Sequence, residues 1–93
     1  MPTSLSAQKR DRQNAKRRTR NRVVKSVVRN RIRKLVTALD SGDAEAAGNE
    51  FRVAVRALDK AVSKGVLHRN TAARRKSRLA ARLKKLAAQG QQA

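Results

Sequence analysis

Apolar residues recur at helical spacing in three separate stretches of the chain. The three sets are Val24, Val28, Ile32, Leu35, Val36 and Leu39; Ala47, Phe51, Ala54, Val55, Leu58, Ala61 and Val62; and Ala72, Leu79, Leu83 and Leu86. Each set follows an i, i+3/i+4 pattern, which indicates one apolar face of an amphipathic helix. No stretch shows the alternation of a half-buried strand. The pattern therefore predicts an all-α protein with three helices.

Turn and cap residues place the boundaries of these helices. Gly42 is suited to a C-terminal cap, with Ser41 or Asp43 as the next N-cap, and Gly65 closes the second helix. Ser4 or Ser6 caps the first helix, and Asn70 caps the third. We expect helices at about 5–39, 44–64 and 71–88, and a fraying tail at 89–93. The short connections predict an antiparallel three-helix bundle in which residues 1–93 form a single domain.

The first predicted helix is too long for a bundle of this size to cover along its whole length. Residues 3–41 contain neither Gly nor Pro, and a helix over 5–39 extends about 50 Å at about 1.5 Å per residue. Residues 7–22 offer only Ala7 and Ala15 as apolar side chains, so this half is polar all round and should protrude. The alternative for the free protein is disorder, because such a segment buries too little apolar surface to offset its ordering entropy.

Charge dominates the composition. The chain has 25 Lys and Arg against 6 Asp and Glu, a net charge of +19, which repels itself unless a polyanion neutralises it. Five of the six acids lie within residues 40–59, away from both basic arms. An Arg-rich, acid-poor start is also typical of a mitochondrial transit peptide, but residues 1–22 lack the apolar stripe of one.

The sequence offers little for catalysis. Cysteine is absent and His68 is the single histidine, so no catalytic triad and no metal-ligand set can be assembled, and we expect no enzyme, metal, cofactor or small-molecule substrate. His68 lies between a glycine cap and an expected Asn cap, so it either stabilises the turn or donates to a phosphate. Without cysteines, nothing points to an oxidising compartment.

Basic residues on the third predicted helix form a row. Arg74, Arg78, Arg82 and Lys85 follow i, i+4, i+8, i+11 along one edge, and the helix carries no acid. A solvated face is the alternative, but like charges at i, i+4 destabilise a helix, so something outside it should offset them.

Several kinds of anionic partner are compatible with this charge. Arg outnumbers Lys by 16 to 9, and a guanidinium matches phosphate in a bidentate fashion. Because the single aromatic residue, Phe51, falls on a core face, recognition should use phosphates and three-dimensional shape, which favours structured RNA. A DNA-compacting nucleoid-type protein is the alternative that bulk charge supports equally. A membrane-active peptide is disfavoured, because the leucine face is narrow and Trp is absent.

The residues resemble the bacterial small-subunit ribosomal protein twenty family. The similarity runs from about Ser6 to Leu86 and includes "SAQKRDRQNAKRRTRNRVVKSVVRNRIRKL", "LDSGD" and, most specifically, "KGVLHRNTAARRKSRLAARL". The resemblance implies a three-helix bundle with a long basic first helix that binds small-subunit (16S) rRNA early in ribosome assembly. It also implies a place among RNA helices of the 5′ domain and beside the long 3′ minor-domain helix, in the cytoplasmic ribosome.

Carried over residue by residue, the resemblance implies an RNA-facing set. Its members are Lys9, Arg10, Arg12, Lys16, Arg17, Arg18, Arg20, Arg22, Lys25, Arg29, Arg33, Lys34, His68, Arg69, Asn70, Arg74, Arg75, Lys76, Arg78 and Arg82. Two positions depart from the family pattern: Thr71 stands where relatives often have Lys, and Gly48 weakens the second helix. We expect a monomer off the ribosome, with no membrane partner.

Overall fold

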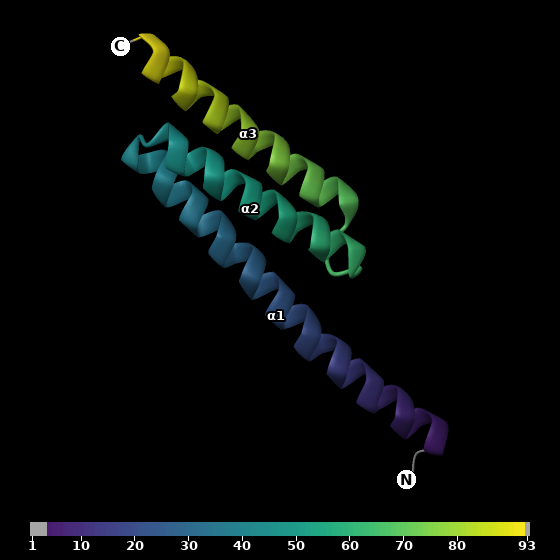
Figure 1. Ribbon diagram of the computed structural model, residues 1–93. Helices are drawn as coiled ribbons and strands as arrows, with labels where there is room; N and C mark the ends of the chain where they lie inside the picture. Colours follow the sequence, from purple (N-terminus) through teal and green to yellow (C-terminus); the bar gives the residue numbers. More distant parts are fainter. Residues whose placement is uncertain (1–3, 93) are drawn as a thin grey trace.

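Three helices make up the protein, as the apolar pattern predicts. The computed structural model describes residues 4–92, with side chains described for residues 4–89. The helices are α1 (Leu5–Ser41), α2 (Ala44–Ser63) and α3 (Arg69–Gln92). They run antiparallel in chain order, with α1 and α3 pointing the same way (Figure 1). The all-α class and the three-helix arrangement are confirmed.

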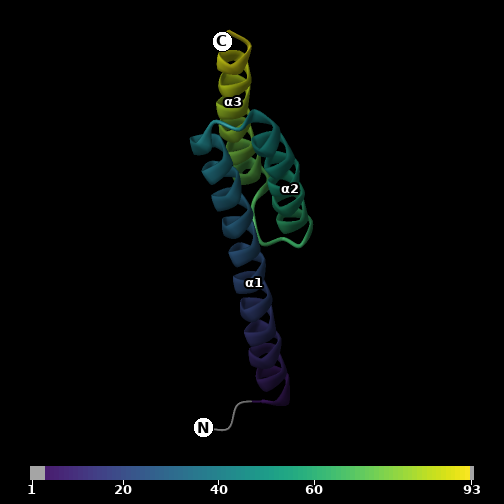
Figure 2. The same ribbon diagram turned by 60° about the vertical axis from the view of Figure 1, so that its left-hand side comes forward.

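The molecule is a rod, because α1 is much longer than the bundle. Its extents are 71 × 21 × 17 Å, and its radius of gyration is 18.4 Å, whereas a compact chain of this length has about 12 Å. The N-terminal half of α1 projects beyond α2 and α3 in every view (Figures 1 and 2). From residue 5 to residue 20, every side chain except that of Ala7 is exposed. We call residues 5–20 the projecting segment; its protrusion is confirmed.

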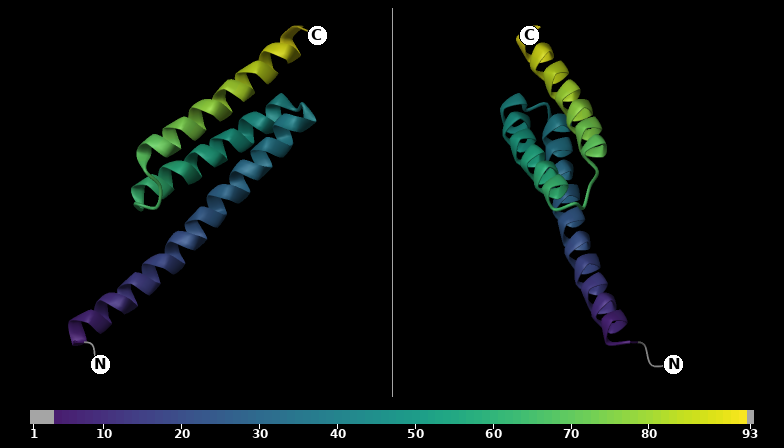
Figure 3. Two further views of the ribbon diagram at one scale, coloured as in Figure 1. Left: turned by 180° about the vertical axis from the view of Figure 1, so that it is seen from behind. Right: turned by 90° about the vertical axis from the view of Figure 1, so that its right-hand side faces the viewer.

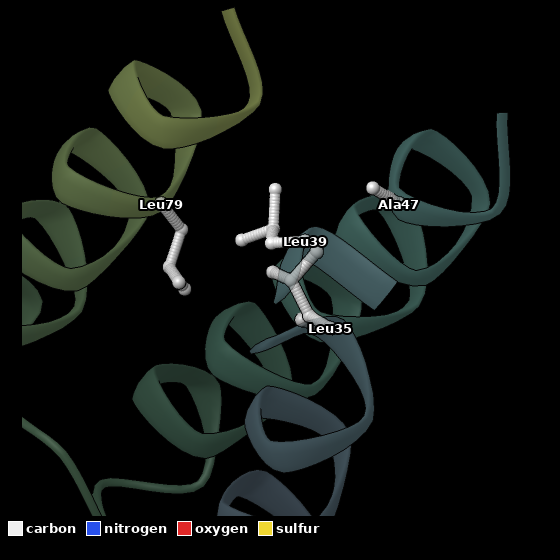
Figure 4. Close-up of a cluster of buried hydrophobic side chains, with 5 residues drawn as sticks. Leu35, Leu39, Ala47 and Leu79 are labelled. Carbon is white, nitrogen blue, oxygen red and sulfur yellow. The ribbon is translucent and has the colours of Figure 1, made fainter. Parts of the chain in front are cut away.

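The core is thin and consists of two clusters along the bundle. In the first, Leu35 and Leu39 of α1 pack with Ala47 and Ala54 of α2 and Leu79 of α3. Figure 4 shows Leu79 opposite Leu39 and Leu35. In the second, Val28, Leu58, Ala61 and Ala72 are buried together. Small alanines on α2 let the helices approach closely, so few large side chains fill the interior.

Not every expected core residue is fully buried. Leu35 and Leu58 are completely inaccessible, whereas Ile32, Phe51 and Leu83 are half-buried and pack against the edge of the clusters. A three-helix arrangement with a narrow core leaves one side of each larger residue open to solvent. The expected faces are therefore correct in register, but the centre of the core consists of Leu, Val and Ala.

The predicted caps form at the start of α1 and in the turn between α1 and α2. Ser4 Oγ accepts from the Ala7 backbone N–H at 3.2 Å at the start of α1. Gly42 ends α1 with a φ of 80°, in the left-handed region that favours glycine. The Asp43 carboxylate then accepts from the Ala46 backbone N–H at 3.1 Å. The helix α1 ends two residues later than expected, at Ser41.

The turn between α2 and α3 is a glycine cap. Gly65 has a φ of 73°, its N–H donates to the Val62 carbonyl, and the Val66 N–H donates to the Ala61 carbonyl. These two bonds make a Schellman motif. Val66 and Leu67 pack against the second cluster, as expected for the hydrophobic partners of such a cap.

The ends of α3 differ from the sequence-based prediction. Its first residue is Arg69, and the residue before it, His68, accepts the Asn70 backbone N–H with Nδ1 at 3.1 Å. The expected N-cap at Asn70 is therefore wrong, because the helix already includes Asn70 and the imidazole two residues before it supplies the acceptor. The helix also continues to Gln92 instead of ending near residue 88, so residues 89–92 are helical; Ala93 lies outside the described residues.

Candidate nucleic-acid interface

The positive charge belongs to two of the three helices. The helix α1 carries 13 basic and 2 acidic residues, and α3 carries 8 basic residues and no acid. The helix α2 carries 3 of each. The packing places α2 between its two neighbours in Figure 1. The excess charge is therefore concentrated on α1 and α3, and α2 is an electrically balanced support.

Nearly all of the expected RNA-facing residues are accessible. Of that set only Lys76 is half-buried; the other side chains are exposed. The structure divides most of the set into three groups. One group lies on the projecting segment, a second lines a groove between α1 and α3, and a third makes contacts within the protein. Four residues belong to none of these groups and are simply exposed: Arg22, Lys34, Arg69 and Arg74.

The projecting segment carries basic side chains around its whole circumference. Lys9, Arg12 and Lys16 border one shallow depression on its surface together with Gln13. Arg10, Arg17 and Arg18 lie at other angles of the same helix, since successive residues are separated by about 100°. A helix with exposed cations at many angles that extends beyond the bundle is suited to a polyanion that surrounds it.

The second group lines what we call the α1–α3 groove. Its lining residues are Arg29, Ile32 and Arg33 of α1 and Arg75, Arg78 and Leu79 of α3. The groove holds about 360 Å³. The right-hand view of Figure 3 shows α3 next to the C-terminal half of α1, the two helices that supply these residues. Four guanidinium groups from two helices thus face one hollow with an apolar floor.

The third group makes ion pairs across helices. Lys76 Nζ lies 2.9 Å from Asp59 Oδ1 of α2, and Arg82 Nη2 lies 3.1 Å from Asp40 Oδ1 of α1. All four side chains are at least one-third exposed, so each pair contributes at most about 1 kcal/mol to stability. Part of the charge on α3 is therefore offset from within the protein, which the sequence pattern did not indicate.

Arg20 also has a partner inside the protein. Its Nη2 donates to the Lys64 carbonyl at 3.4 Å, at the C-terminal end of α2. A cation at this position interacts favourably with the negative end of the helix dipole. Arg20 thus marks the level at which α1 leaves the bundle and the projecting segment begins.

His68 has a structural role in this fold. Its Nδ1 accepts the Asn70 backbone N–H, so this nitrogen is not free to donate to another partner. Nε2 is consequently the nitrogen able to donate to a phosphate. The turn-stabilising interpretation is supported by the cap, and an RNA contact by the same ring stays a prediction.

Two features of the interface escaped the sequence-based prediction. Arg31, absent from the expected set, borders a depression on α1 with Val27, Asn30 and Lys34. The sequence pattern places Ile32 and Leu79 in the core alone, whereas in the structure they also line the α1–α3 groove. Charge alone could have indicated Arg31, whereas the groove depends on how α1 and α3 pack.

Within residues 4–92, no helix is both long and apolar enough to cross a membrane, and no three potential metal-ligating side chains gather.

Comparison with known proteins gives consistent matches. The sequence model of the family described as ribosomal protein S20 matches residues 2–84. A small ribosomal subunit protein bS20 of Corynebacterium efficiens is 55% identical over 84% of this chain and 90% of its own length. The bS20 of Saccharophagus degradans is 47% identical over 95% of this chain and all of its own. The bS20 of Corynebacterium aurimucosum is 55% identical over 94% of this chain.

Proposed function

Because the chain belongs to the ribosomal protein S20 family, we propose that it is a structural constituent of the small ribosomal subunit in the cytoplasm. It binds small-subunit rRNA directly and stabilises the packing of RNA helices during assembly. The relatives are named as proteins of the small ribosomal subunit. The proposed role needs no chemical step, cofactor or small-molecule substrate.

One observation carries this proposal: the projecting segment is a cationic rod that extends beyond the bundle, with only Arg20 at its base bonded to the α2 end. Sixteen residues at about 1.5 Å each extend about 24 Å beyond the bundle, and their basic side chains point in all directions. A flat anionic surface would satisfy only one side of such a rod. Folded RNA can present phosphates on several sides of one helix, which accounts for the distribution of charge.

The physical mechanism is the release of counterions combined with shape fit. Each phosphate that a Lys or Arg neutralises frees condensed cations, so affinity falls steeply with salt. If the protein contacts 6 to 10 phosphates, its affinity falls about 10³- to 10⁵-fold between 50 and 200 mM salt. The free protein is proposed to be a monomer, because association would bring two chains of +19 together.

The test is equilibrium binding with competition. The labelled ligand is an rRNA fragment that contains the 5′ domain and the long 3′ minor-domain helix. We expect binding to survive an excess of duplex DNA and of tRNA. Equal displacement by duplex DNA would favour a DNA-compacting protein, and equal displacement by both competitors would rule out specific rRNA recognition.

A matched pair of variants tests which surface carries the interaction. Arg12→Gln/Lys16→Gln removes two charges at i, i+4 from the projecting segment, and Arg52→Gln/Arg56→Gln removes two exposed charges from α2 at the same spacing. The first should lower the slope of log K against log salt by about 1.5 to 2. The second should leave that slope unchanged. Equal slopes for both variants would show that total charge, and not its placement, governs binding.

A further inference from the structure

The α1–α3 groove differs from an ordinary phosphate-binding surface in its floor. Leu79 is 8% exposed at the base of the groove, and half-buried Ile32 lies across from it on α1. A phosphate placed on this floor would lose hydration without gaining a hydrogen-bond partner. The four arginines form the rim. The groove therefore fits a ligand with an apolar face and negative charges at its edges.

A neighbouring depression extends the groove along α1. Its lining residues include Lys25, Val28 and Leu67, and it shares Arg29 and Arg75 with the first depression. Lys25 to Arg33 corresponds to about 12 Å along the helix axis. The described lining of both depressions contains cationic and apolar side chains and no carboxylate. Charge complementarity thus extends over more than one charged group of a ligand.

Two interhelical ion pairs link α3 to the other two helices. Arg82 joins α3 to α1 through Asp40, and Lys76 joins α3 to α2 through Asp59. Arg75 and Arg78 lie within two residues of Lys76 but line the hollow. Neighbouring cations on one helix thus have different roles: two are paired within the protein, and two face the groove.

From these observations we infer that the α1–α3 groove accommodates an unpaired nucleotide of the RNA, an inference that rests on the proposed rRNA binding. The base lies against Ile32 and Leu79, and the flanking phosphates meet the arginine rim. Guanidinium planes stack on unstacked bases and so replace the aromatic platform of other single-strand binders. The single aromatic residue, Phe51, packs against the first core cluster.

Chemical probing of the protein–rRNA complex tests the inference. The rRNA fragment described above is treated with dimethyl sulfate and with a 2′-hydroxyl-acylating reagent, free and bound to the full chain. Arg75→Gln/Arg78→Gln removes two groove cations. The matched control, Arg52→Gln/Arg56→Gln, removes two exposed cations of α2 that do not line the groove. Circular dichroism confirms that both variants keep the helical content of the wild type.

We expect the wild type to protect a small number of nucleotides that are unpaired in the free RNA. The groove variant should restore their reactivity at protein concentrations that saturate the RNA, and the control variant should keep them protected. Loss of protection at the same nucleotides in both variants would overturn the inference, as would protection confined to paired segments. Failure of the wild type to bind the fragment would overturn the proposed function instead.

Defined hairpins provide an independent measurement. One RNA hairpin carries a single bulged 2-aminopurine and its partner is fully paired. The wild type should prefer the bulged hairpin by at least about fivefold, the lower limit for stacking of one base, with a change in 2-aminopurine fluorescence. The groove variant should lose this preference. Equal affinity of the wild type for both hairpins would refute the base-binding role while leaving phosphate binding intact.

Discussion

Gly48 offers the sharpest test of the packing of α2. It lies inside the helix, near its N-terminal end, and is half-buried. Its φ is in the ordinary range, and a Cβ built at this position has no neighbouring atom within 4 Å. Nothing in the backbone or the packing therefore requires glycine here. Replacement by alanine should stabilise the protein.

The magnitude follows from helix propensity alone. Alanine is favoured over glycine in a helix interior by about 1 kcal/mol, and the open space adds no steric cost. For a domain of 60 to 100 residues, about 1 kcal/mol corresponds to a rise of about 4 to 8 °C in the melting temperature. This is a large fraction of the stability expected from a core in which four of the nine buried residues are alanine.

Gly42 is the matched control. Gly42→Ala makes the same chemical change, and a Cβ there also meets nothing within 4 Å, but the φ of 80° disfavours any other residue. Its cost should be about 1 to 2 kcal/mol, so the two variants should shift stability in opposite directions.

The assay is thermal and urea unfolding followed by far-ultraviolet circular dichroism, at a salt concentration held constant across variants. The affinity of Gly48→Ala for rRNA should equal that of the wild type, because α2 carries no net charge. A neutral or destabilising Gly48→Ala would contradict the open environment of this residue. A neutral Gly42→Ala would contradict the left-handed turn.

Three further predictions concern the core, the ion pairs and the projecting segment. Leu58→Ala, at a completely buried position, should lower the free energy of urea unfolding by about 2 to 5 kcal/mol; unchanged stability would contradict the helix register. A double-mutant cycle on Arg82→Ala and Asp40→Asn should give a coupling free energy below about 1 kcal/mol in thermal unfolding, and a larger value would show that the pair is shielded from solvent. Backbone amides of residues 5–20 should exchange with deuterium fastest in the free protein, because this segment extends beyond the bundle, and the proposed rRNA binding should slow their exchange; equal protection in both states would refute this.

Local sequence features were sufficient for the helices and most of their ends. Periodicity identified the buried faces, and the caps at Ser4, Gly42, Asp43 and Gly65 follow from residues whose conformational preferences act over a few neighbours. The prediction failed at the start of α3, where His68 and Asn70 were competing acceptors. The path of the chain out of the glycine turn decides whether the His68 or the Asn70 side chain caps the helix.

Charge placement along the chain likewise followed from composition, including the protrusion of a segment with almost no apolar residues. The sequence could not show that Lys76 and Arg82 find acidic partners 17 and 42 residues away. Nor could it show that Arg29, Arg33, Arg75 and Arg78 meet around one hollow. These are relations between helices, and they depend on the rotation and separation at which the helices pack. Helical periodicity fixes the angle of a side chain about its own axis, but only the packed bundle determines what that side chain faces.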